Sequence, residues 1–194
     1  MQQEAVDLSQ TTGHNNSYML IKEVIMLCNK CGCSIMYDAV EVAWKMLKVA
    51  KDKNIQLSNL QLQKLVYIAN GYMLGWKNKS LCTQPMEAWE YGPVIGDVYH
   101  AFKSNGKDVI PVNTDIVTAL DNDKDAEYII SGVLDNYGKK SAPELVNLTH
   151  QEDSPWTEVW EREAKHYRSV PIDDDLIKNH YRKLISGNTT VRGL

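Results

Sequence analysis

The chain has 194 residues, of which 43% are hydrophobic and 24% charged, a composition typical of a folded domain and not of a disordered segment. Its formal net charge of −4 and pI near 5.7 argue against nucleic acid as the main partner, because phosphate binding depends on clustered lysine and arginine. No stretch predicts a membrane span, since Lys22 and Glu23 interrupt the short apolar segment from Tyr18 to Leu27, and we expect a cytoplasmic protein.

Residues 1–35 are mostly polar and predict a leader that is loosely ordered or not native to the protein. Three of the four cysteines, Cys28, Cys31 and Cys33, lie in this leader. Two thiolates spaced Cys-x-x-Cys can bind zinc, but a structural zinc site needs four ligands and no second such pair follows. The three cysteines are therefore weak metal candidates, and we expect reduced thiols and no cofactor.

Helical periodicity begins at Met36 and continues to Ala50, which predicts an amphipathic first helix and a domain spanning residues 36–185. A second helix is predicted from the capping box at Ser58-Asn59-Leu60-Gln61 to the break at Asn78-Lys79-Ser80. Its apolar arc is wide enough to place it at the centre of the fold. Between residues 81 and 91 the helical period disappears, which favours a short strand or hairpin there.

The pair Gly92-Pro93 predicts a turn that starts a third helix with Val94 on its inner face. Another short extended piece is expected over residues 109–112, and an acidic linker over residues 121–125. Later helices are predicted from residue 126 to a stop at Gly138, from the capping box at Ser141, from Pro155, and from the acidic residues 173–175 to residue 185.

The predicted fold is thus mainly α: a single helical domain of about six or seven helices with a short β-strand or hairpin insertion near residues 81–91. Residues 186–194 are expected to form a flexible tail.

Several short motifs occur along this domain in a fixed order. They are Leu-Gln-Leu-Gln-Lys-Leu-Val-Tyr at residues 60–67, Glu-Ala-Trp-Glu-Tyr-Gly-Pro-Val at residues 87–94, Thr149-His150 and Pro155-Trp156. Together they resemble the Panacea domain family, the SocA-like and GepA-like group of antitoxins and phage-associated proteins. The resemblance spans roughly residues 36–185, and the leader before Met36 has no counterpart in the family pattern.

The resemblance implies an antitoxin that neutralises a partner toxin by direct protein binding, with the toxin encoded by an adjacent gene. It also leaves open a protease adaptor that delivers the toxin for degradation. A different alternative is a DNA-binding repressor of the protein's own operon, against which stand the acidic balance and the lack of a basic recognition helix. The resemblance implies no enzyme, and the chain contains no phosphate-binding loop, nucleophile elbow or zinc-protease motif.

The candidate partner-binding or motif residues are Trp89, Tyr91, Gly92, Pro93, Tyr99, Thr149, His150, Pro155 and Trp156. Large aromatic residues usually pack in a core, but the same residues are favoured anchors in binding grooves. His150 with Glu152 suggests a general base or metal ligand, but we favour a structural role in which its ring caps a helix end. No catalytic residue is proposed.

Overall fold

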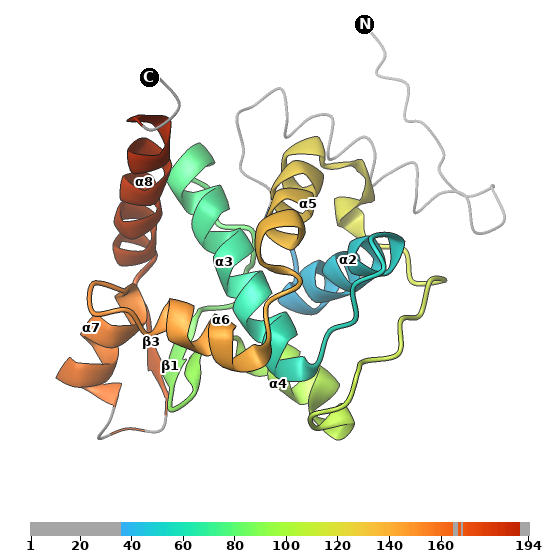
Figure 1. Ribbon diagram of the computed structural model, residues 1–194, viewed down its shortest axis with the longest axis horizontal. Coiled ribbons are helices and arrows are strands. Elements are labelled where there is room, and N and C mark those ends of the chain that lie inside the picture. Colours follow the sequence, from blue (N-terminus) through green and yellow to red (C-terminus); the bar gives the residue numbers. More distant parts are fainter. Residues whose placement is uncertain (1–35, 165–166, 168, 191–194) are drawn as a thin grey trace, which may run out of the picture. The chain divides into compact units, whose positions relative to one another are not determined.

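The protein is described from a computed structural model that covers residues 36–164, 167 and 169–190. The expected leader, with its three cysteines, and residues 191–194 lie outside the described residues. The described part is mainly helical, as predicted, with seven α-helices and three short strands (Figure 1).

Each predicted helix is present, and most begin at a residue whose side chain satisfies the free amide groups of the first turn. Asp38, Ser58, Asp123, Ser141 and Ser154 serve in this way. The helices are α2 (Ala39–Asp52), α3 (Asn59–Lys77), α4 (Gly96–Phe102), α5 (Lys124–Tyr137), α6 (Ala142–Thr149), α7 (Pro155–Arg162) and α8 (Asp174–Thr190), with 3₁₀ turns η1 (Lys103–Asn105) and η2 (Ala119–Asn122).

Helix α3 is central, as its wide apolar arc predicts. It packs against α2, α5, α6 and α8, and Figure 1 shows it between α5 and α8. The contact with α8 is the closest: a Cβ atom built on Gly71 would lie 2.2 Å from the ring of Tyr181. Only a glycine allows this approach, so the α3–α8 interface depends on the absence of a side chain at residue 71.

The strands form a small antiparallel sheet in the order β2-β1-β3, made of β1 (Glu87–Trp89), β2 (Gly92–Val94) and β3 (Val170–Pro171). The hairpin expected near residues 81–91 is therefore present, but its second strand lies beyond that range. Trp89 pairs with Gly92 and Ala88 with Pro93, so the turn is Glu90-Tyr91.

The prediction that Gly92-Pro93 forms the turn and starts a helix was wrong. Pro93 and Val94 continue as strand β2, and α4 begins only at Gly96. The reason lies in α3, where Gln63 accepts a hydrogen bond from the amide of Ile95 at 3.0 Å and Lys64 donates one to the carbonyl of Pro93 at 3.0 Å. These long-range bonds hold the chain extended where local sequence favours a helix start.

Two connecting segments also differ from expectation. Residues 109–112 form no strand, and their one bridge joins Val109 to Ser58. In the acidic linker, Asp121 closes a capping box with Thr118 and Asp123 caps α5, and both carboxylates pair with lysines. The acidic residues there serve as helix caps and not as a solvated spacer.

The last helix continues beyond the expected residue 185 to Thr190, so residues 186–190 are helical. No proline interrupts this stretch, and the hydroxyl of Ser186 donates to the carbonyl of Arg182, four residues earlier, at 2.9 Å. Among the described residues, no helix combines the length and the hydrophobicity needed to cross a membrane.

Candidate functional site

The β1–β2 hairpin carries most of the candidate residues, and the structure divides them into two groups. Gly92 and Pro93 are buried against α3, whereas Tyr91 at the turn is exposed. Trp89 lies between the two environments, half-buried. Gly92 and Pro93 belong to a buried cluster that includes basic side chains, on one side of the hairpin. Tyr91 and the ring of Trp89 belong to an open aromatic groove on the other side.

The inner group, which we call the lysine–histidine core, consists of Lys64, Gly92, Pro93 and Trp156, which are buried, and His150, which is half-buried. The side chain of Lys64 is fully buried, and its ammonium group donates to the carbonyl of Pro93 at 3.0 Å. Gly92 has a φ of +100°, and a Cβ atom there would lie 2.7 Å from Lys64 Nζ and 3.0 Å from His150 Nε2. A glycine is therefore required by both the backbone conformation and the space between two basic groups.

His150 ends α6, and its ring stacks on the ring of Trp156, with centroids 3.6 Å apart and planes 6° from parallel. The indole nitrogen of Trp156 donates to the carbonyl of Trp89 at 2.8 Å, which ties α7 to the hairpin. The expected ring cap does not occur: the backbone amide of His150 bonds to Val146, and the ring packs instead.

The neighbouring candidates stabilise the junction between α6 and α7. The hydroxyl of Thr149 donates to the carbonyl of Val146 at 3.0 Å, and its own carbonyl accepts from the hydroxyl of Ser154 at 2.8 Å. Pro155 opens α7 at its first position, where its missing amide costs no hydrogen bond. These contacts position Trp156 under the hairpin.

Burial lowers the pKa of Lys64 from 10.5 to about 7. Burial, followed by the positive charge of Lys64, also lowers the pKa of His150 below its ordinary value. His150 Nε2 is buried and has no hydrogen-bond partner among the described residues. Glu152 and Asp153 are exposed, and no cluster of three metal-binding side chains occurs in the described part of the chain. The lowered pKa keeps the ring of His150 uncharged at neutral pH, and in this form it stacks on Trp156.

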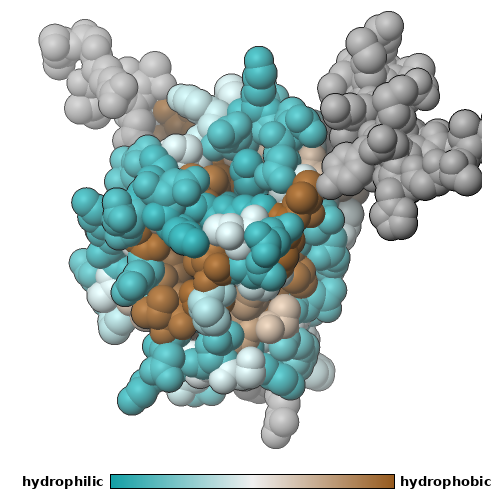
Figure 2. Space-filling view, turned by 90° about the vertical axis from the view of Figure 1, so that its right-hand side faces the viewer, coloured by the Kyte–Doolittle hydropathy of each residue, from teal (hydrophilic) through white to brown (hydrophobic). Residues whose placement is uncertain are grey.

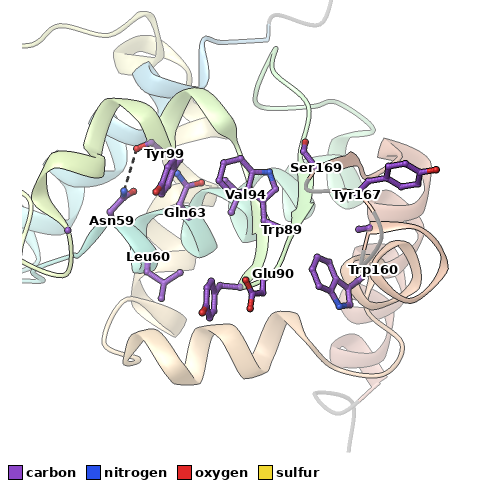
Figure 3. A pocket seen from close by; sticks show the side chains of 13 residues that line it. Asn59, Leu60, Gln63, Trp89, Glu90, Val94, Tyr99, Trp160, Tyr167 and Ser169 are labelled. Atoms are coloured by element: carbon purple, nitrogen blue, oxygen red, sulfur yellow. Dashed lines mark hydrogen bonds between the residues drawn. The ribbon is translucent and has the colours of Figure 1, made fainter.

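On the other side of the hairpin lies a groove of about 960 Å³, which we call the aromatic groove (Figure 3). Its walls are the rings of Trp89, Tyr91, Tyr99, Trp160 and Tyr167. Tyr91 and Tyr167 are 65% and 66% exposed, and Tyr99 is 37% exposed. Aromatic rings gathered in this way on a surface are characteristic of binding sites.

Contacts behind the groove hold two of its tryptophans in place. The indole nitrogen of Trp89 donates to Glu87 at 2.8 Å, and its ring meets the edge of Tyr99 at 5.2 Å between centroids. Trp160 stacks on Trp156, at 5.3 Å between centroids. The two interpretations of Trp89 thus apply to different atoms: its carbonyl anchors the core and its ring lines the groove.

Three residues of these two sites were missed by the sequence analysis. Trp160 and Tyr167 were not among the candidate residues. Lys64 lies in the wide apolar arc of α3, and a lysine in such an arc is the signal that could have indicated a buried ammonium group. No local pattern indicates that Tyr167 approaches the hairpin, because this contact is made across the fold.

A second hollow, of about 510 Å³, lies beside the loop that follows η1. Its described lining includes no aromatic ring and combines aliphatic residues such as Ile55 and Val109 with the polar Lys51, Asn54 and Gln56. Figure 2 shows the face on the right of Figure 1, where apolar side chains gather between polar ones. The second hollow offers aliphatic and polar contacts but no aromatic ring, and it provides a comparison for the aromatic groove.

Comparison with known proteins gives two matches. The family model "Antitoxin SocA-like, Panacea domain" matches residues 62–157, which include the hairpin, Lys64, His150 and Trp156. The chain is 34% identical over 155 residues to a protein named Antitoxin SocA from Caulobacter vibrioides (strain NA1000 / CB15N), covering 75% of this chain and 82% of that protein. No solved structure matches.

Proposed function

Because the chain belongs to the SocA-like antitoxin family with the Panacea domain, we propose that it neutralises a partner toxin by direct protein binding. The observation that carries the proposal is the similarity to a protein named as an antitoxin, which extends over most of both chains. The toxin would be a protein encoded by an adjacent gene.

The surface of the protein supports this mechanism. The exposed tyrosine rings and the half-buried tryptophan rings of the groove offer large contact areas that lose little conformational entropy on binding. Lys64 and His150, whose pKa values are lowered by burial, are not among the residues that line this groove. Neutralisation would therefore depend on the stability of a complex, and we expect no turnover and no cofactor.

The proposal is tested by co-expressing the chain with the product of the adjacent open reading frame at graded levels. Growth should be rescued up to a fixed ratio of the two proteins, and the purified proteins should form a complex of defined stoichiometry. Protection by far less than one chain per toxin molecule would contradict direct binding and indicate catalysis.

The same strains separate the alternative mechanisms. If the chain delivers the toxin to a protease, the toxin level falls on co-expression and recovers when cellular proteases are deleted. If the chain represses its own operon, it binds promoter DNA with an affinity that decreases steeply with salt. Direct neutralisation predicts a constant toxin level and no such DNA binding.

A further inference from the structure

The aromatic groove contains one negatively charged side chain in addition to its aromatic rings. Glu90, in the turn of the hairpin, lines the groove with an exposed carboxylate that has no ion pair or hydrogen bond within the described residues. It is the one charged side chain among the groove's described lining residues. Covering this carboxylate with an apolar partner would remove its hydration without replacement, which is unfavourable.

A second carboxylate lies directly behind the groove wall. Glu87 accepts hydrogen bonds from the indole nitrogen of Trp89 at 2.8 Å and from the hydroxyl of Ser169 at 2.7 Å, both on the same oxygen atom. Ser169 and Trp89 both line the groove. Glu87 therefore fixes the orientation of the tryptophan ring and adds a second negative charge beside the groove wall.

Aromatic faces beside carboxylates select one kind of side chain. A cation is attracted to the face of a tryptophan or tyrosine ring and pairs with a carboxylate. Arginine fits this combination better than lysine, because its guanidinium group is planar, stacks on rings and donates two parallel hydrogen bonds. The rings of Trp89 and Trp160 are held by neighbours behind them, so little entropy is lost when a planar group stacks on them.

We propose that the aromatic groove is the surface that binds the toxin, and that it accepts an arginine side chain exposed on the toxin. The guanidinium group pairs with Glu90 and stacks on the surrounding rings, while Glu87 acts as a positioning residue for Trp89. This inference rests on the proposed function, because it takes the occupant to be the neutralised toxin.

The preference for a guanidinium group can be measured without the toxin. N-acetyl-arginine amide, N-acetyl-lysine amide and N-acetyl-leucine amide are titrated into ¹⁵N-labelled full-length protein, and the indole signals of Trp89 and Trp160 are followed. The arginine amide should shift both signals at millimolar concentrations, more strongly than the lysine amide. Equal shifts with the leucine amide would overturn the choice of a cation.

Binding of the product of the adjacent open reading frame tests the groove itself. Glu90→Gln and Tyr91→Ala should each weaken binding roughly tenfold or more, since both residues contact the partner and neither supports the core. Glu127→Gln and Tyr128→Ala are matched controls, because both residues are exposed on α5, outside the groove, and these changes should leave binding intact. Unchanged binding in both groove variants would overturn the proposal.

A double-mutant cycle identifies the partner residue. Each arginine of the toxin is changed to glutamine, and one of these changes should weaken binding about as much as Glu90→Gln, with little further loss when the two are combined. If no arginine couples to Glu90, the assignment fails although the antitoxin function stands. If the unaltered chain neither binds nor rescues, the proposed function fails, and the inference with it. A dimer of the free protein that Tyr91→Ala dissociates would show that a second copy occupies the groove and would also overturn the proposal.

Discussion

The two sides of the β1–β2 hairpin place neighbouring residues of one motif in different environments, one buried and one open to solvent. On the inner side, Gly92 and Pro93 pack against Lys64 and His150, and the ammonium group of Lys64 is buried there. On the outer side, Tyr91 and the ring of Trp89 face an open groove. The comparison shows that one short motif can serve stability and binding at once, because Tyr91 in the turn is exposed whereas Gly92 and Pro93 of strand β2 are buried.

The inner side contains features that are costly in free energy. Within the described residues, the buried ammonium group of Lys64 has no carboxylate partner and the Nε2 atom of His150 has no hydrogen bond, and both features destabilise the folded state. These costs are offset by the stacking of His150 on Trp156 and by the bond from Trp156 to the hairpin. Substitutions on this side should therefore change stability first, and those on the outer side should change binding first.

The largest loss of stability is expected for Trp156→Ala. The residue is buried, stacks on two rings and anchors the hairpin by its indole nitrogen, so emptying its site should lower the free energy of unfolding by about 3–5 kcal/mol. Denaturant titration measures this loss. A variant that unfolds at the same denaturant concentration as the parent chain would show that the inner side is not structural.

The next largest effect is a pH dependence that comes from Lys64. Its pKa is about 7 in the folded protein and 10.5 in the reference state, so between these values the unfolded chain binds more protons. The free energy of unfolding should therefore rise by about 2–5 kcal/mol as pH increases from 7 to 10. Lys64→Met should remove most of this slope and stabilise the protein at pH 7.

Lys51→Met is the matched control for this experiment, because Lys51 is exposed on α2. It should leave the slope unchanged. If Lys64→Met keeps the parent slope, the ammonium group of Lys64 is not buried in solution.

Trp89→Ala should have a smaller effect on stability, about 1–2 kcal/mol, because its ring is only half-buried and its backbone bond to Trp156 remains. The loss of toxin binding should be larger than the decrease in the folded fraction of the protein can explain. Calorimetry and a binding titration on the same sample separate the two effects. A loss of 4 kcal/mol or more would place the ring in the core and not at the groove.

His150→Gln should lower stability at neutral pH by about 1 kcal/mol, the usual contribution of a stacked ring pair. Because the folded-state pKa of His150 is below its ordinary value, acid must protonate a partly buried ring, and stability falls as pH decreases through 6.5. In the glutamine variant, this contribution to the decrease in stability at acid pH should be absent. Toxin neutralisation should follow the amount of folded protein, and a fully folded variant without activity would contradict a purely structural role.

The smallest effect is expected from starting the chain at Met36. The first helix that is described begins at Ala39 with its own cap, Asp38, and we predict that the melting temperature changes by no more than a few degrees. Thermal unfolding of the two chains tests this domain boundary. A large decrease, or an insoluble product, would show that the domain begins earlier.

The sequence was sufficient to predict elements whose signals are local. Capping boxes at Ser58 and Ser141 and the proline at Pro155 start helices where expected, because the side chains that satisfy the first turn are only a few residues away. The wide apolar arc of α3 likewise predicted its central position. The motifs also indicated the family, and the comparisons confirmed it.

Only the tertiary structure decided how the hairpin uses its residues. The local sequence at Gly92-Pro93 favours a turn and a helix start. The segment is held as a strand because Lys64 bonds to Pro93, 29 residues away in sequence, and Gln63 bonds to Ile95, 32 residues away. Tyr167 joins Trp89 in the groove although no pattern links them. The burial of a side chain and its pKa depend on residues that are distant in sequence. For this reason the lowered pKa of Lys64 follows from the fold and is not indicated by its sequence neighbours.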